Sequence, residues 1–246
     1  MSKFWLFWCT YIGLGLVCSV VEHFRPARKL HLWRLDALPL DLVAAALFQF
    51  VFFATASRLV AHIPVQFKAT QLMLAFPLPL RVVVYYFAGD FGSYWLHRLM
   101  HKPQLWRVHR FHHSVTQLWW LSGVRATIPQ QFLFNLPYMM WAPLLVGAGP
   151  DVFHGLMVAG IVTNHWMHMN VAWRSNGLEK IIITPRYHHV HHSANVKAHD
   201  GNYGTVFTIW DRMFGTFIDP DSTQVRVFGL GQPLRPLALL RYVIGV

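Results

Sequence analysis

Ten histidines of this chain fall into four groups whose spacing suits the binding of metal ions. The groups are His97 and His101; His109, His112 and His113; His165 and His168; and His188, His191 and His192. Residues three or four apart lie on one face of a helix, so each group can direct its imidazoles towards a single point. Because one zinc ion needs only about four ligands, ten imidazoles predict a site for two metal ions.

The other ligand types in the chain restrict which kind of site this can be. Carboxylate-bridged di-iron centres in four-helix bundles need several inward-facing glutamates, and this chain has only Glu22 and Glu179. That architecture is therefore excluded. Neutral imidazoles suit iron, zinc, copper or nickel, and of these choices only a redox metal could activate oxygen. The histidines themselves leave iron and structural zinc open.

The composition is typical of a membrane protein. Of the 246 residues, 54% are hydrophobic and only 13% are charged, and the mean hydropathy is +0.34. The formal net charge of +11 could indicate nucleic-acid binding. However, the basic residues are distributed between apolar segments rather than gathered on one polar face. Positive-inside membrane topology explains this distribution better, and we expect no nucleic-acid partner.

The apolar segments predict an all-α, polytopic membrane protein with about four to five transmembrane helices and a cytoplasmic helical cap. The cap is expected to hold a histidine-rich dinuclear metal site. A bilayer needs about 20 apolar residues per helix. Pro77 and Pro79 are expected to kink the third span. The expected spans are 4–21, 38–61, 70–89, 129–146 and 152–168.

We interpret the chain, residues 1–246, as a single domain. Residues 1–89 form the first three spans, 90–128 carry the first two histidine motifs, 129–169 form a helical hairpin, and 170–246 form the cap with the last histidine motif. If the basic loop after the first span is cytoplasmic, most of the 21 Lys and Arg residues are cytoplasmic too. All four histidine groups then lie on the cytoplasmic face.

Four segments together resemble one known family. They are DFGSYWLHRLMH, LWRVHRFHHS, TPRYHHVHHS and DGNYGTVFTIWDRMFGTF. They are similar to the fatty acid hydroxylase superfamily, also called the sterol desaturase family, whose members are integral-membrane, non-haem di-iron enzymes that hydroxylate or desaturate lipids with oxygen. The family's eight-histidine signature falls on His97, His101, His109, His112, His113, His188, His191 and His192. His168 resembles a further ligand of the family.

Several residues outside that signature are also candidates for the site. His165 lies one helical turn before His168, so its spacing suits either a ligand or a residue that orients one. Ligating histidines generally donate their second N–H to a carboxylate or carbonyl. We therefore expect Asp90, Asp200 and Asp211 to orient imidazoles, with a helix cap or turn as an equal alternative for Asp211. His189 is expected to lie behind the ligands, and we predict no catalytic residue beyond the metal ligands.

The resemblance implies a membrane lipid substrate, O2, and two iron ions that zinc can replace in purified protein. Because no haem- or flavin-binding segment is recognisable, electrons are expected from a separate ferredoxin or b-type cytochrome. The signature histidines and His168 should converge on one cavity, with an apolar tunnel walled by the hairpin. Hydroxylation and desaturation both stay open. A zinc-dependent membrane hydrolase or isomerase could use the same histidines, whereas metal transport would place them at several depths.

Overall fold

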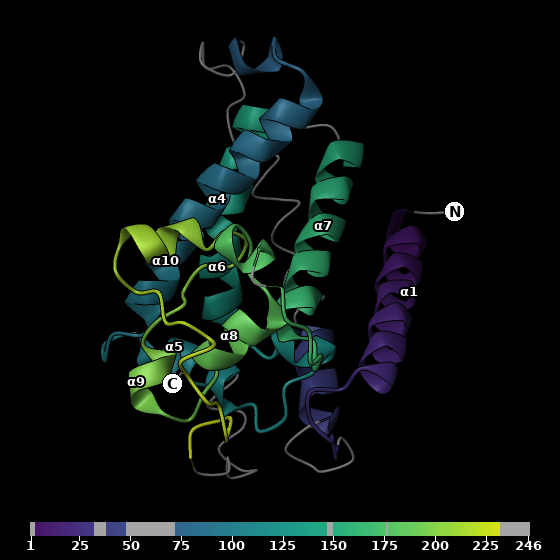
Figure 1. Cartoon of the computed structure of the whole chain (residues 1–246). Coiled ribbons are helices and arrows are strands. Elements are labelled where there is room, and N and C mark those ends of the chain that lie inside the picture. Colours follow the sequence, from purple (N-terminus) through teal and green to yellow (C-terminus); the bar gives the residue numbers. More distant parts are fainter. Residues whose placement is uncertain (1–2, 32–37, 48–71, 147–149, 176, 232–246) are drawn as a thin grey trace.

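The computed structural model describes residues 3–31, 38–47, 72–146, 150–175 and 177–231 (Figure 1). These described residues are helical or irregular, with isolated β-bridges such as Pro26–Val171 and Ile182–Phe207 in place of strands. The prediction of an all-α chain is confirmed for them. The long helices are α1 (Lys3–Phe24), α4 (Leu78–Met100), α6 (Ile128–Trp141) and α7 (Pro150–His168).

The long helices form two packed pairs, α4 with α6 and α1 with α7. α4 packs along α6 and the π-helical turn η3 (Ala142–Val146). α7 packs against α1, against the 3-10 segment η2 (Trp120–Val124), and against the short helix α8 (Pro185–His191). In Figure 1, α7 stands between α1 and the α4–α6 pair. α6 and α7 are the two arms of the predicted hairpin, and residues of both line the cavity described below.

Proline determines where the helix that carries the first histidines begins. The residues at 72–74 are helical, the chain leaves the helix at 75–77, and Pro77 is the N-cap of α4. Pro79 stands in the first turn, where its missing N–H removes no hydrogen bond. The prolines thus separate two helices instead of kinking one. From Leu78, α4 continues unbroken past Asp90 and delivers His97, and His101 caps its C-terminus.

Glycines on α4 allow α6 to approach closely. A Cβ atom added at Gly92 would lie 2.7 Å from Cβ of Pro137, and one at Gly89 would lie 2.3 Å from Cδ1 of Tyr138. These separations are shorter than carbon atoms tolerate. The close contact between the two helices therefore depends on glycine at both positions.

We predict that Gly92→Ala lowers the thermal stability of the protein, because the rigid ring of Pro137 cannot move aside. Overpacking of this kind costs about 1–3 kcal/mol. Gly13, in α1, is the matched control, since nothing lies within 4 Å of a Cβ added there. Gly13→Ala should be neutral or stabilise by about 0.5–1 kcal/mol through improved helix propensity. Equal unfolding temperatures for the two variants would contradict the account of the α4–α6 contact.

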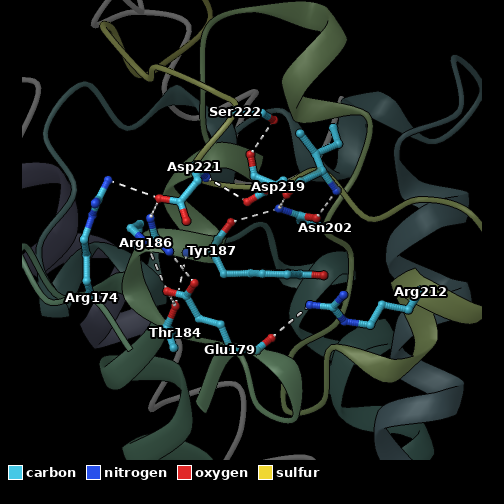
Figure 2. Close-up of polar contacts among 11 residues, drawn as sticks. Arg174, Glu179, Thr184, Arg186, Tyr187, Asn202, Arg212, Asp219, Asp221 and Ser222 are labelled. Carbon is cyan, nitrogen blue, oxygen red and sulfur yellow. Dashed lines mark hydrogen bonds and ion pairs between the residues drawn. The ribbon is translucent and has the colours of Figure 1, made fainter. Parts of the chain in front are cut away.

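The last third of the described chain folds over the ends of α4 and α7 as short helices joined by irregular segments. These helices are η4 (Leu178–Lys180), α8, α9 (Val196–His199) and α10 (Ile209–Met213). Figure 2 shows the polar network that fixes the start of α8. Thr184 is its N-cap and accepts from the Tyr187 N–H. Arg186 pairs with both Glu179 and Asp221, each at 2.5 Å. These contacts hold the helix that presents the last histidine motif.

The expected spans correspond to helices where the structure describes them, except that the third is interrupted at 75–77. The first is α1, the fourth is α6 with η3, and the fifth is α7. For the second span only residues 38–47 are described, and they are helical. Residues 48–61 of that span, 70–71 of the third and the turn at 147–149 lie outside the described residues. None of the described helices combines the length and the apolar character that crossing a bilayer requires.

Candidate metal centre

Five histidines form a first cluster in which a nitrogen of each lies within 4.8 Å of a nitrogen of every other. They are His97, His101, His109, His113 and His191. Nε2 of His109 lies 3.0 Å from Nε2 of His97 and 3.1 Å from Nε2 of His113. The cluster draws on α4 and its cap, the single turn α5 (Trp106–His109), the 3-10 turn η1 (His112–Ser114) and α8. Histidines that are up to 94 positions apart in the sequence therefore meet at one buried point.

A second cluster of four histidines adjoins the first. It consists of His112, His168, His188 and His192, within the same mutual 4.8 Å limit. Nε2 of His188 lies 3.0 Å from Nε2 of both His168 and His192. The rings of His113 and His192, one from each cluster, are 4.7 Å apart. The nine histidines predicted to converge do so, as two adjoining groups.

Each His-x-x-His-His motif contributes to both clusters. The first motif sends His109 and His113 to the first cluster and His112 to the second. The last motif sends His191 to the first cluster and His188 and His192 to the second. His188 and His191 are three residues apart on the short helix α8 and so share one of its faces, yet they belong to different clusters, which places the two clusters side by side against that face. The two groups are therefore parts of one structure.

Four of the clustered histidines hydrogen-bond a backbone carbonyl through Nδ1. These hydrogen bonds determine the tautomer of each ring and leave Nε2, which faces the other histidines, with a free lone pair. Nδ1 of His97 lies 2.7 Å from the Tyr203 carbonyl and Nδ1 of His191 lies 2.8 Å from the Gly201 carbonyl. In the second cluster, Nδ1 of His112 and of His168 face the carbonyls of Arg125 and Asn164 at 3.0 and 2.7 Å. A carbonyl only accepts, so each of these Nδ1 atoms carries the proton and Nε2 is an unprotonated acceptor.

This arrangement fits a cation in each cluster. Nε2 of His168 and Nε2 of His112, both acceptors, face each other at 3.4 Å with no proton to share. Nε2 of His191 is buried with no hydrogen-bond partner among the described residues. Burial lowers the pKa of His112 to about 4, and burial and then the neighbouring histidines lower the pKa of His191 well below its usual value. Neutral rings with converging lone pairs are the donor set that metal ions require.

Of the three aspartates expected to orient imidazoles, only Asp200 contacts one. Its Oδ1 lies 3.3 Å from Nδ1 of His101. Asp90 instead accepts from the backbone N–H groups of Thr205, Val206 and Phe207 and from the Trp210 indole. The structure thus corrects the expected role of Asp90. A carboxylate buried at the middle of α4 is satisfied by a loop of backbone donors, not by a histidine.

Asp211 is corrected in the same way and serves the same loop. It accepts from the N–H groups of Tyr203 and Gly204 and from the Thr216 hydroxyl, all at 2.7 to 2.8 Å. Burial raises the pKa of Asp211 to about 6, although these hydrogen bonds oppose the rise. The turn alternative is the one observed. Because the Tyr203 carbonyl faces His97, Asp90 and Asp211 act on the first cluster indirectly, by fixing the loop at 203–207.

Two further histidines of the prediction lie outside both clusters. His189, expected to lie behind the ligands, is buried with Nε2 3.0 Å from the Met169 carbonyl. His165 does not join His168. Its ring packs against Tyr11 and Trp120, with centroids 5.2 and 4.8 Å apart, and the described structure offers neither of its nitrogens a hydrogen-bond partner. A position in the metal-binding set is therefore not proposed for His165.

Sequence reasoning missed a buried ion pair that supports the second cluster. Nε and Nη2 of Arg125 each lie 2.6 Å from Oδ1 of Asp41, and the side chains are 1% and 0% exposed. The Trp119 indole donates to Asp41 as well, at 2.7 Å. The Arg125 carbonyl faces Nδ1 of His112, so the pair fixes that imidazole. The sequence does contain a signal for this pair. Asp41 is a single acidic residue inside an apolar segment, and a charged residue in such a segment needs a partner.

Glu22 is a second supporting residue that the sequence did not single out. One of its oxygens accepts from the backbone N–H groups of Trp120 and Asn170, both at 2.8 Å, and so joins the end of α1 to the segments around the second cluster. Burial raises the pKa of Glu22 from 4.5 to about 7, and the two hydrogen bonds only reduce the rise. The ionised form is therefore destabilising in the folded state.

We expect Glu22→Gln to stabilise the protein at pH 8 and to have little effect at pH 5. The pKa of Glu22 in the folded state lies above its unfolded value. The contribution of Glu22 to the free energy of unfolding of the wild type is therefore highest below about pH 4.5, where Glu22 is protonated in both states, and falls as pH rises to about 7. Glutamine can accept both hydrogen bonds but carries no charge, and the shift corresponds to about 3 kcal/mol. The measurement is the difference in unfolding temperature between variant and wild type at each pH. A difference that does not depend on pH would contradict the burial of a titrating carboxyl.

A cavity of about 190 Å³ reaches the imidazoles of both clusters. His97 of the first cluster and His112, His168 and His188 of the second line it. The rest of its wall is mainly apolar or aromatic and comes largely from α4, α6 and α7, with Tyr11 of α1, residues of η2 and the loop at 205–206 completing it. Lining residues on α7 extend from His168 back to Leu156, which is about 18 Å at the α-helical rise. The cavity therefore suits a largely apolar molecule that lies along α7 and reaches the histidines.

Comparison with known proteins identifies the family. The fatty acid hydroxylase family matches residues 82–216, which is more than half of the chain. Alkylglycerol monooxygenase of Danio rerio is 36% identical over 59% of this chain and 32% of its own length. An ornithine lipid hydroxylase of Rhizobium tropici is 36% identical over 62% of this chain and 47% of its own. A methylsterol monooxygenase of Arabidopsis thaliana is 25% identical over 55% and 47%.

The matched region contains all nine histidines of the two clusters. The chain spans a third to a half of the length of these relatives, and no solved structure matches it significantly. Residues 82–216 include both His-x-x-His-His motifs, His97, His101 and His168, and thus every member of the two clusters. The chain belongs to the fatty acid hydroxylase family.

Proposed function

We propose that this protein is a membrane-bound non-haem di-iron oxygenase that hydroxylates or desaturates a C–H bond of a lipid, using O2 and electrons from a separate donor protein. The observation that carries the proposal is the pair of adjoining imidazole clusters at the end of one largely apolar cavity. The names of the relatives support the same substrate class, since they are monooxygenases or hydroxylases of alkylglycerols, ornithine lipids and methylsterols.

The donor set assigns the metal-binding residues within this proposal. His97, His101, His109, His113 and His191 would hold one ion, and His112, His168, His188 and His192 the other. Iron bound there would supply the activation of O2 that oxidation of an unactivated C–H bond requires. The chain's own side chains bind and orient. Carbonyls of Tyr203, Gly201, Arg125 and Asn164 fix the imidazoles, and the apolar wall excludes water and positions the lipid.

A membrane location is supported by the exposed surfaces of the long helices. Ile12, Leu16, Val17 and Val20 on α1 are more than half exposed. Leu80, Val83 and Phe87 on α4 are also exposed. Apolar side chains gathered along the length of a helix are typical of a surface that contacts lipid or protein. A lipid substrate dissolved in the bilayer could then enter the cavity without crossing water. In this proposal the metal centre lies on the cytoplasmic face.

The test of this function is the conversion of lipids by the purified protein in the presence and absence of O2. With ferrous iron and a reduced ferredoxin or b-type cytochrome, a membrane lipid should gain 16 mass units if hydroxylated, or lose 2 if desaturated, as measured by mass spectrometry. The His112→Ala variant is the matched control and should give neither product. A product formed equally well without O2 would exclude the oxygenase and favour a zinc-dependent hydrolase or isomerase.

A further inference from the structure

His165 is a buried polar residue that the metal centre does not use. It lies on α7 one turn before His168, its side chain is 1% exposed, and it lines the cavity. Tyr11 and Trp120 contact its ring edge-on, with interplanar angles of 74° and 66°. Both ring nitrogens are buried, and no described residue forms a hydrogen bond with either. An unmade hydrogen bond of this kind costs about 1–3 kcal/mol for each group.

The donor and acceptor of the His165 imidazole determine which ligand groups could form hydrogen bonds with it. A neutral imidazole offers one donor and one acceptor. A hydroxyl group offers the same pair of functions, whereas an alkyl chain or an ether cannot both donate and accept. A further unpaired acceptor lines the same cavity, because Oε1 of Gln131 on α6 is buried and has no hydrogen-bond partner among the described residues. The imidazole of His165 therefore matches a ligand that carries a hydroxyl, and the cavity offers such a ligand a second acceptor.

We propose that His165 binds a hydroxyl group of the lipid substrate, so that the preferred substrates are lipids with a hydroxyl a few carbon atoms from the carbon that is oxidised. This inference rests on the proposed function and deepens it. The position of the hydroxyl follows from the helix. His165 precedes His168 by three residues, which is about 4.5 Å of helical rise. The remainder of the cavity continues along α7 towards Leu156, away from the histidine clusters, and accepts the chain or ring system.

The competing explanation is that His165 is a tenth metal ligand. The cluster geometry disagrees, because His165 belongs to neither group of mutually close nitrogens. The two explanations differ in a measurable way. A ligand would change the metal content of the protein when substituted, whereas a hydroxyl-binding residue would change only how well hydroxylated lipids bind.

The experiment measures equilibrium binding of hexadecanol and of its methyl ether, which has the same chain but no hydroxyl donor, to the purified metal-loaded protein. We expect the wild type to bind the alcohol at least about tenfold more tightly, the discrimination that one paired buried hydrogen-bonding group provides. His165→Phe keeps a ring between Tyr11 and Trp120 and should abolish the discrimination. His165→Asn, which retains a donor and an acceptor, should restore part of it.

Met157→Leu is the matched control, since Met157 lines the same cavity from α7 without a hydrogen-bonding group. It should change the affinity for both lipids alike. Unchanged metal content in His165→Phe supports the proposal, whereas loss of metal overturns it in favour of ligation. Equal binding of the two lipids by the wild type, or discrimination retained by His165→Phe, also overturns it and leaves the lipid oxidase intact. If the wild type binds neither lipid, the lipid function itself fails as well.

Discussion

His191→Ala and His192→Ala, which alter neighbouring residues, are each expected to abolish lipid oxidation and to remove one metal ion from a different cluster. His191 belongs to the first cluster and His192 to the second. Substitution of a residue that merely orients a ligand typically costs 10–100-fold in metal affinity or activity. Removal of a ligand should therefore reduce turnover by more than about a hundredfold. Turnover and metal content per chain are the two measurements.

His189→Ala is the matched control for both variants. His189 lies in the same motif and is also buried, but its Nε2 faces the Met169 carbonyl and neither cluster includes it. This variant should retain both metal ions. Wild-type turnover in His191→Ala or in His192→Ala would remove that histidine from the site. Loss of metal from His189→Ala to the same extent would show that the motif responds as a whole and would contradict the division into two clusters.

Arg125→Met is expected to destabilise the protein by about 3–5 kcal/mol, because it leaves Asp41 as a buried carboxylate without its cationic partner. The Arg125–Asp41 contacts of 2.6 Å are fully enclosed. The backbone carbonyl of residue 125 is retained in the variant, but the segment around it is no longer held by the ion pair with Asp41. The orientation of His112 should suffer, so occupancy of the second cluster should fall more than that of the first. Chemical or thermal unfolding and metal analysis give the two readouts.

The double variant Asp41→Leu with Arg125→Met separates a buried charge from a simple loss of packing. Replacing both partners of a buried ion pair with apolar residues is often close to neutral. We therefore expect the double variant to recover much of the stability lost in Arg125→Met. Recovery will be incomplete, because the Trp119 indole loses its acceptor. If the double variant is less stable than Arg125→Met, the buried carboxylate is not the cause of the destabilisation.

The histidine spacing predicted the local groups of imidazoles, because helix periodicity is local, but it also grouped His165 with His168, and His165 lies outside both clusters. His97 and His101 are placed by one continuous helix, and His188, His191 and His192 by one turn of another and its cap. How the residues divide into two clusters was not predictable. The division depends on how α8 and the segments at 106–114, which are far apart in sequence, come together in the tertiary fold.

The residues that support the centre illustrate the same limit. Asp90 was expected to orient an imidazole because ligating histidines generally donate their second N–H to a carboxylate or carbonyl. Its actual partners are the N–H groups of the loop at 205–207, more than a hundred positions away. Likewise, nothing local links Asp41 to Arg125. A buried carboxylate requires a partner, but only the tertiary fold determines which one it finds.

The helices followed from apolar length and proline position. The segment 4–21 is the core of α1, and the segment 152–168 is most of α7. The break before α4 falls at Pro77, but the prolines alone do not distinguish a separation of two helices from a kink in one. That choice depends on how 72–74 and α4 pack against their neighbours. It could not be read from the proline alone.

The most direct test of the two-ion centre is anomalous X-ray diffraction at the iron absorption edge from crystals of protein loaded with ferrous iron. The account predicts two peaks. One should be surrounded by His97, His101, His109, His113 and His191, and the other by His112, His168, His188 and His192. A single peak, or peaks surrounded by other residues, would contradict the dinuclear centre and with it the proposed oxidation of lipids.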